Sequence, residues 1–320
     1  MTLIIILIVV IAAILAVSYA AYRIPFYHPR HTESPYDLPP EAQYDPYRET
    51  MTALITAADA LPFEPVEIAS HDGAKLFGRY YRAADEAPLL IGFHGYKSTA
   101  LRDMCGASEL ARQMEVNTLF VDQRAHGRSD GKTISFGVKE RFDCLSWARY
   151  AAERWPGRPI VLMGVSMGAA TVLMASDLEL PREVKGIIAD CPYSDPSAII
   201  KKVGRDSMGS ASILLYPFIL LGARLYGGFS LTAASPLKAV RRAKVPILLV
   251  HGEDDRFVPC DMSREVYDAC AGAKTRVTVP GAPHGIAYVL DPDKYGRAVR
   301  RFLASAAGYL SDADKQARLR

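Results

Sequence analysis

Cysteine is scarce in this chain of 320 residues, and no two cysteines form a Cys-x-x-Cys pair. Their number is odd, and each lies in a segment with the character of a helix or a strand: Cys105, Cys144, Cys191, Cys260 and Cys270. A disulfide framework and a zinc site are therefore not expected, and no metal ligands are predicted. Unpaired cysteines of this kind are more common in a reducing compartment than in an oxidising one.

A strong excess of one charge is also missing. The net charge is +3, with 23% charged and 50% hydrophobic residues. Such a mild balance, without a basic stripe interleaved with aromatic residues, argues against a nucleic-acid partner. The hydrophobic content is enough for a sizeable core, and global disorder is not expected.

Charged residues are absent from 3–21, a run rich in Ile, Leu, Val and Ala. As a helix this run would be about 28 Å long, close to the thickness of the hydrocarbon core of a bilayer. Aromatic residues gather at its end, as they do at membrane interfaces: Tyr19, Tyr22, Phe26 and Tyr27. We therefore predict a transmembrane anchor over residues 1–24.

A cleaved signal peptide is the alternative for this segment, with a small-x-small cleavage site at 18–20. Two features argue against it: no Lys or Arg precedes the apolar run, and the run is longer than the apolar region of a signal peptide. Positive side chains follow the span, at Arg23, Arg30 and Arg48. By the positive-inside rule, these arginines predict a catalytic domain on the cytoplasmic side of the membrane.

Residues 25–61 are expected to be a Pro-rich tether followed by a short helix near 45–60. Strand-like and helix-like segments then alternate over 62–310, and 311–320 is a polar tail. A hairpin is expected around Asp72 and Gly73, followed by six apolar strands at 89–93, 118–121, 160–163, 184–189, 245–250 and 275–279. Helices are expected at 101–114, 138–154, 167–177, 261–271 and 292–307. This alternation predicts an α/β fold with a mostly parallel, eight-stranded sheet covered by helices on both faces.

One interval breaks this rhythm, because more than fifty residues separate the strand at 184–189 from the strand at 245–250. We expect a helical cap insertion at about 195–235, over the end of the sheet where reactive residues gather. Its apolar run at 211–221 is too short to span a bilayer and contains Pro217. Ordinary cap packing explains this run, and an acyl-binding roof or a membrane-touching face is the alternative.

The strongest motif is Gly-Val-Ser-Met-Gly at 164–168, between an apolar strand and a helix of small residues. Gly-x-Ser-x-Gly in this context is a nucleophile elbow, which lifts the hydroxyl of Ser166 out of the sheet. Gly164 and Gly168 are needed because the turn leaves no room for side chains. The N–H groups that begin the helix then point toward a developing negative charge.

Three further motifs follow strands. Residues 251–259 place acidic side chains just beyond one strand, and the loop at 280–285 presents His284 beyond the last one. Serine, carboxylate and histidine thus occur in the order that a nucleophile-elbow hydrolase requires. The backbone N–H of Tyr96, just after the strand at 89–93, is expected to be a second oxyanion donor.

Together these motifs resemble the α/β-hydrolase fold over about 62–310. Within that fold the chain is similar to the membrane-anchored serine hydrolases often called BEM46-like, or described as related to prolyl oligopeptidases. The matching motifs are His94-Gly-Tyr, Asp-Gln-Arg-Ala-His-Gly-Arg-Ser at 122–129, the elbow at 164–168, His-Gly-Glu-Asp-Asp at 251–255, and His284-Gly. The predicted anchor agrees with that subgroup.

The resemblance implies a role for each residue. Ser166 attacks an acyl carbonyl, His284 takes its proton and later returns it to the leaving group, and Asp255 orients the imidazole. The backbone N–H groups of Met167 and Tyr96 hold the oxyanion. No metal and no organic cofactor is expected.

Some residues have competing interpretations. Glu253 and Asp254 adjoin Asp255, and Asp190 at the end of an earlier strand is another candidate for the acid.

Among the remaining polar residues, His94 and His251 are expected to be structural hydrogen-bonding groups. Arg124 and His126 either contact substrate or belong to a turn held by ion pairs, and Cys105 is either a redox-sensitive thiol or a helix-packing residue.

We therefore expect a membrane-anchored serine hydrolase that cleaves a carboxylic ester, a thioester or another acyl bond in a small acyl or lipid-like substrate. A serine peptidase is the alternative, although the chain has no propeller-like domain to gate peptides. A non-catalytic binding protein on the same scaffold would normally have lost Ser166, Asp255 or His284, and all three are present.

Overall fold

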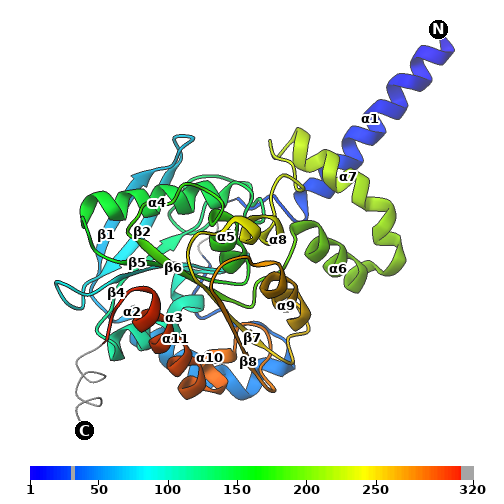
Figure 1. Cartoon of the computed structure of the whole chain (residues 1–320). Helices are drawn as coiled ribbons and strands as arrows, with labels where there is room; N and C mark the ends of the chain where they lie inside the picture. Colours follow the sequence, from blue (N-terminus) through cyan, green and yellow to red (C-terminus); the bar gives the residue numbers. More distant parts are fainter. Residues whose placement is uncertain (30–32, 311–320) are drawn as a thin grey trace.

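The computed structural model describes residues 1–29 and 33–310, so the predicted polar tail at 311–320 lies outside the described residues, as does Arg30. An eight-stranded sheet in the order β1-β2-β4-β3-β5-β6-β7-β8 forms its centre (Figure 1). The strands are β1 (Glu64–Ala69), β2 (Lys75–Tyr81), β3 (Leu89–Phe93), β4 (Asn117–Asp122), β5 (Ile160–Val165), β6 (Val184–Asp190), β7 (Ile247–Gly252) and β8 (Lys274–Val279). Strand β2 runs antiparallel to β1 and β4, and the other neighbours are parallel. The predicted α/β-hydrolase fold is confirmed.

The inner strands are buried on both faces because apolar residues follow one another without alternation, as in β3, β4, β5 and β7. The strand predicted to begin at Val245 begins at Ile247 instead. Pro246 has no N–H group to donate, and its carbonyl accepts from Ile187 just before pairing starts.

Helices cover both faces of the sheet. One face carries α4 (Glu140–Arg154), α5 (Met167–Ala175) and α9 (Cys260–Ala269). The other carries α3 (Ala100–Gln113), α10 (Ala287–Leu290) and α11 (Pro292–Ala306). The short helix α8 (Pro236–Ala239) precedes β7. The core therefore consists of two apolar layers on either side of the strands.

The segment before the sheet wraps around the body. The helix expected near 45–60 is divided into a 3₁₀ helix over Ala42–Tyr47 and α2 (Arg48–Asp59). Pro46 lies inside the 3₁₀ turn, and a proline is tolerated there more easily than inside an α-helix. Helix α2 packs on α3 through the buried side chains of Ile55 and Cys105.

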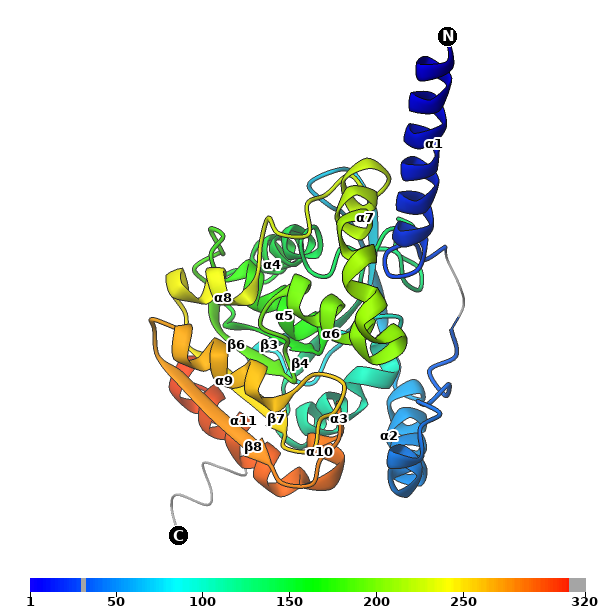
Figure 2. The same cartoon turned by 90° about the vertical axis from the view of Figure 1, so that its right-hand side faces the viewer.

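The first helix, α1 (Thr2–Arg23), leaves the body as a long rod (Figures 1 and 2). Only its last turns are buried, at Ser18, Ala21 and Tyr22, and they pack against the cap helix α7 (Ser212–Leu225). The two helices approach very closely, because a Cβ atom at Gly222 would lie 2.3 Å from the carbonyl oxygen of Ser18.

The interval between β6 and β7 contains the helical cap. It consists of α6 (Pro196–Met208), a 3₁₀ turn and α7 (Ser212–Leu225), which lie beside α1 in both views (Figures 1 and 2). Among the described residues, two helical stretches are long and apolar enough to cross a membrane. Thr2–Arg23 has a mean hydropathy of 3.1 and Pro196–Leu225, the cap itself, has 1.5.

Candidate active site

Ser166 stands at the turn between β5 and α5. Its φ of 56° and ψ of −114° are rare for a residue with a side chain, and such strain is typical of functional turns. A Cβ atom at Gly164 would lie 2.2 Å from the carbonyl carbon of Gly168, and one at Gly168 would lie 2.0 Å from the carbonyl oxygen of Phe93. The turn therefore has room for glycine only at these two positions.

The side chains of Ser166, His284 and Asp255 form one hydrogen-bonded chain. The Nε2 atom of His284 lies 2.9 Å from the hydroxyl oxygen of Ser166, and its Nδ1 atom lies 2.6 Å from Oδ2 of Asp255. The three residues come from the turn after β5, the loop after β8 and the loop after β7, all at the carboxyl end of the sheet. In this geometry the serine can donate its proton to the imidazole while the carboxylate holds the other nitrogen.

The side chain of Asp255 is fully buried, and its carboxylate accepts several hydrogen bonds. Its Oδ1 atom accepts from the backbone N–H groups of Phe257 at 3.0 Å and Val258 at 2.8 Å. Burial by itself would raise the pKa of the Asp255 carboxyl, but the charge of His284 and hydrogen bonds from two histidines hold it below its ordinary value. Asp255 is therefore ionised at neutral pH.

The other acidic candidates have hydrogen-bond partners or surroundings that differ from those of Asp255. The Glu253 carboxylate accepts from the hydroxyl of Thr278 at 2.6 Å, and Asp254 is exposed. Asp190 is buried at the end of β6, where it accepts from the hydroxyl of Tyr295 at 3.0 Å. Burial raises the pKa of Asp190 to about 6, which suits a structural carboxyl better than a permanent anion.

The oxyanion candidates lie beside the serine. Met167 is the first residue of α5, a helix buried along its whole length, so its N–H is at the positive end of the helix dipole. Tyr96 follows β3, and Tyr96, Ser166 and Met167 line one cavity together.

Two other histidines hold the loop of Tyr96 in place. The Nε2 atom of His94 accepts from the N–H of Gln123 at 3.0 Å, and that of His126 accepts from the N–H of Lys97 at 3.1 Å. Burial lowers the pKa of both imidazoles, which stay neutral as acceptors. These contacts give both residues a structural role.

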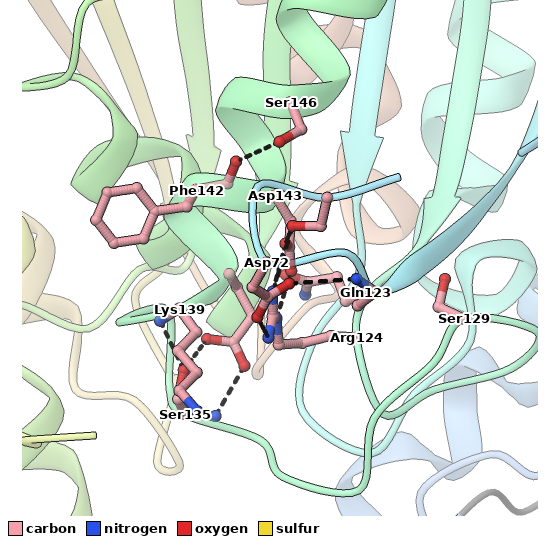
Figure 3. Close-up of polar contacts among 12 residues, drawn as sticks. Asp72, Gln123, Arg124, Ser129, Ser135, Lys139, Phe142, Asp143 and Ser146 are labelled. Atoms are coloured by element: carbon pink, nitrogen blue, oxygen red, sulfur yellow. Dashed lines mark hydrogen bonds and ion pairs between the residues drawn. The ribbon is translucent and has the colours of Figure 1, made fainter. Parts of the chain in front are cut away.

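Arg124 lies in a buried cluster of ion pairs (Figure 3). Its Nε atom donates to Asp143 at 2.5 Å and its Nη1 atom donates to Asp72 at 3.0 Å. The Arg124 bonds lower the pKa of the Asp72 carboxyl to about 2. Of the two interpretations of this motif, the ion-paired turn therefore fits the structure.

Cys105 is buried on α3, and burial raises the pKa of its thiol to about 12. A thiol that stays protonated is a poor redox sensor, so the structure favours the packing role.

Two triads of potential metal ligands occur among the described residues, and neither fits an ion. In the first, Cys191 lies near Asp255 and His284. Burial raises the pKa of the Cys191 thiol far above its ordinary value, so this thiol does not supply the thiolate that a metal prefers. The second contains His71, and its two carboxylates already pair with Arg124.

The sequence predicts only a general structural role for His251 and does not indicate its contact with Asp255. Its Nε2 atom lies 3.2 Å from Oδ2 of Asp255 and 2.9 Å from the carbonyl oxygen of Val258. Both partners are acceptors, so this nitrogen carries the proton and donates. The signal in the sequence is the spacing of four residues between His251 and Asp255, which a turn after β7 can bring together.

Two cavities meet at Ser166. The larger, of about 390 Å³, is bordered by charged side chains that include Arg102, Asp103 and Arg256. The smaller, of about 250 Å³, has no charged residue in its lining and extends toward the cap and the end of α1. The site thus offers a polar space and an apolar space on either side of the same hydroxyl.

The chain is similar in sequence to known serine hydrolases. The sequence profile of a family described as "Serine aminopeptidase, S33" matches residues 84–216, and one described as "Serine hydrolase (FSH1)" matches 210–286. Protein YqkD of Bacillus subtilis, which is uncharacterized, is 26% identical over 74% of this chain and 77% of its own length. Protein ABHD12B of Homo sapiens is 28% identical over 65% of this chain and 59% of its own length.

Solved structures show the same fold. The esterase Pf2001 of Pyrococcus furiosus superposes with a TM-score of 0.61 at 25% identity, over 77% of this chain and 94% of that one. Est1E of Butyrivibrio proteoclasticus, solved with ferulic acid bound, gives 0.59 at 22% identity over 76% of this chain and all of Est1E. The fold is that of the α/β hydrolases. The chain is a serine hydrolase.

Proposed function

We propose that this protein is a membrane-anchored serine hydrolase that cleaves a carboxylic ester, a thioester or another acyl bond through an acyl-enzyme on Ser166. The observation that carries the proposal is the hydrogen-bonded chain from the Ser166 hydroxyl through His284 to Asp255, with distances of 2.9 and 2.6 Å. Ordinary hydrogen-bond lengths between these groups are what proton transfer requires.

The reaction follows from this chain. The Nε2 atom of His284 takes the proton of Ser166 as the hydroxyl oxygen attacks the acyl carbon, and the imidazolium formed is stabilised by Asp255. The N–H groups of Met167 and Tyr96 stabilise the oxyanion, and a single donor of this kind is worth about 3 kcal/mol of barrier. The leaving group departs with the proton from His284. In the second half, His284 takes a proton from water as the water oxygen attacks the acyl carbon, and it returns this proton to the oxygen of Ser166 as the acid is released.

The apolar cavity favours an acyl or lipid-like substrate. An acyl chain can lie against the uncharged lining while its carbonyl carbon reaches Ser166. The esterase description of Pf2001 supports the same reaction class.

A serine peptidase is the second candidate, because the aminopeptidase profile matches 84–216. The two activities separate on paired substrates. We expect model esters to be cleaved faster than the matching aminoacyl amides, and faster cleavage of the amides would favour the peptidase.

Membrane anchoring is supported by α1 and by its contacts with the cap. Helix α1 has no charged side chain before its last residue, Arg23. The guanidinium carbon of Arg23 lies 4.2 Å from the ring centre of Tyr27, as expected at a membrane interface. A signal peptidase cutting after Ala20 would remove Ser18 and Leu15, which contact the cap at Gly222 and Tyr226. These contacts support an uncleaved anchor and, with it, a place in the BEM46-like subgroup.

The anchor is tested by mass spectrometry of the protein recovered from alkaline-washed membranes. We expect residues 1–20 to be present, and a mature chain starting at Ala21 would contradict the anchor. The cytoplasmic orientation stays a prediction, to be tested by protease access in intact cells.

The catalytic assignment is tested with a fluorophosphonate probe on the full-length protein in detergent. The wild type should be labelled and should hydrolyse esters, whereas Ser166→Ala should do neither. Ser146→Ala is a matched control, because this serine lies on α4 and its hydroxyl donates to the carbonyl oxygen of Phe142 at 3.0 Å. Equal labelling of the wild type and Ser166→Ala would remove Ser166 from the mechanism.

A further inference from the structure

The apolar cavity at Ser166 has an unexpected wall. Cap residues from α6 and α7 form one side, including Ile199, Val203 and Leu215, and the residues around the serine form the floor. The remaining side is formed by the last residues of the anchor and the first after it: Ala21, Ile24 and Pro25. The end of the predicted transmembrane anchor and the start of the predicted tether therefore border the substrate space.

A hydrogen bond and aromatic packing fix the end of the anchor to the rest of the protein. The hydroxyl of Tyr96 donates to the carbonyl oxygen of Pro25 at 3.0 Å, which ties the anchor's end to the residue proposed as an oxyanion donor. Phe26 is fully buried, and its ring stands edge-on to Phe136 and Phe229 at centroid distances of 5.8 and 5.2 Å. The end of the anchor is thus part of the packed body.

Ile24 marks the rim of the cavity. Its side chain is 71% exposed although it lines the cavity, whereas Ala21 is only 7% exposed. A residue that borders a cavity and also faces outward lies at its mouth. Met208 of α6 and Phe257 also line the cavity and are 44% and 42% exposed, so they share this rim. Because Ile24 directly follows the anchor helix, the side of the mouth that it forms lies where the chain leaves the proposed membrane span.

The cap also reaches along the anchor. The hydroxyl of Tyr226 donates to the carbonyl oxygen of Leu15 at 3.0 Å, and Leu15 lies about 12 Å before Arg23 along the helix axis. Gly222 meets Ser18 between these two levels. The cap therefore lies against the part of α1 that is expected to enter the apolar layer of the bilayer.

We propose that the end of α1 is one wall of the acyl-chain site, with the mouth of that site beside Ile24. The occupant is the unbranched acyl chain of the ester or thioester, and the alcohol or thiol part occupies the charged cavity on the other side of Ser166. The uncharged lining suits a hydrocarbon chain, and the volume of about 250 Å³ corresponds to roughly eight water-sized groups. This inference rests on the proposed acyl-hydrolase function.

The test compares acyl-chain preference in full-length variants in detergent micelles. For each variant the ratio of kcat/KM for the octanoyl and acetyl esters of p-nitrophenol is measured. Ile24→Trp narrows the mouth and should lower this ratio by about tenfold or more. In a hydrophobic pocket, a difference of one methylene group in the substrate already changes kcat/KM by about tenfold or more. Ile24→Ala widens the mouth and should move the preferred chain length upward.

Ala20→Trp is the control, because it places the same tryptophan side chain at a nearby exposed position of α1 that does not line the cavity. It should keep the wild-type ratio. An unchanged ratio in Ile24→Trp, or an equal fall in both tryptophan variants, overturns the inference. Either result leaves the proposed function intact if hydrolysis still disappears in Ser166→Ala, whereas hydrolysis that persists in Ser166→Ala refutes the function itself.

Discussion

His251 and His284 both point a ring nitrogen at the same oxygen of Asp255. The Nδ1 atom of His284 lies 2.6 Å from Oδ2 of that carboxylate, and the Nε2 atom of His251 lies 3.2 Å from it. His251 lies in β7, one residue before its end, and His284 lies in the loop after β8, but only His284 reaches Ser166. His251 therefore acts as a positioning residue that keeps the carboxylate turned toward His284.

Replacing His251 by phenylalanine should lower kcat about tenfold and change KM little. A hydrogen bond to a charged acceptor contributes about 1.5–3 kcal/mol, and its loss lets the Asp255 carboxylate rotate. His251→Gln keeps a donor and should recover part of kcat. The measurement is steady-state kinetics normalised by active-site titration, so that unfolded protein does not count. Equal kcat in His251→Phe and wild type would contradict the positioning role.

The pH dependence of kcat/KM should follow His284, which must be neutral to accept the serine proton. Burial by itself lowers the pKa of His284, but the charge and hydrogen bond of Asp255 raise it above the ordinary value of 6.5. The wild type should therefore lose activity as the pH falls through a value above 6.5.

Asp255→Asn should move that acid limb to lower pH, because burial still lowers the pKa of His284 and the largest raising influence is gone, although the smaller ones of Asp190 and Asp103 stay. The same change should lower kcat by about 10⁴-fold, since the imidazole loses its orientation. Ester hydrolysis measured from pH 5 to 9 checks both effects. An acid limb at the same pH in both proteins would be inconsistent with Asp255 as the partner of His284.

Gly168→Ala should destabilise the protein by about 3 kcal/mol or prevent folding, because the new methyl group would meet the backbone of Phe93 at 2.0 Å. Gly296→Ala is the contrasting change. Gly296 lies inside α11, where the nearest atom to a new Cβ is the flexible end of Arg300 at 3.4 Å. This helix position should gain about 0.5–1 kcal/mol. Thermal unfolding of the two variants in the same detergent compares them directly.

Arg124→Met should lower the free energy of unfolding by about 3–5 kcal/mol, because it leaves the buried carboxylate of Asp143 without its cation. Arg124→Met combined with Asp143→Leu should recover much of this loss, since the pair is then replaced by apolar side chains. Denaturant unfolding of the single and double variants measures both values. A single variant as stable as the wild type would show that the pair is dispensable.

The fold was predictable because its signals are local. Each strand is an apolar run bounded by turn residues, and the elbow at 164–168 needs two glycines at fixed spacing. The meeting of Ser166 and His284 could be predicted too, because strand ends in a parallel sheet share one edge.

The packing of the anchor's end against the body could not be predicted, because it depends on contacts between segments that are far apart in the sequence. Tyr96 and Pro25 are 71 positions apart, and neither belongs to a motif that would pair them. The sequence pattern places Phe26 in an aromatic belt at the membrane, but the side chain is fully buried in the body against the rings of Phe136 and Phe229. An aromatic residue after an apolar helix fits both settings, so only the folded arrangement distinguishes them.

The near-contact of Gly222 with the backbone of Ser18 bears on how this enzyme can be prepared. A shortened fragment starting near residue 29, made to avoid detergent, would lack α1 and Phe26. The surface of α7 that packs against α1 and the apolar side chains around Phe26 would then be exposed to solvent. Such a fragment should aggregate through these newly uncovered apolar surfaces. Solubilising substitutions on the outward face of the first helix, with its final turns kept, are the sounder route to a water-soluble form.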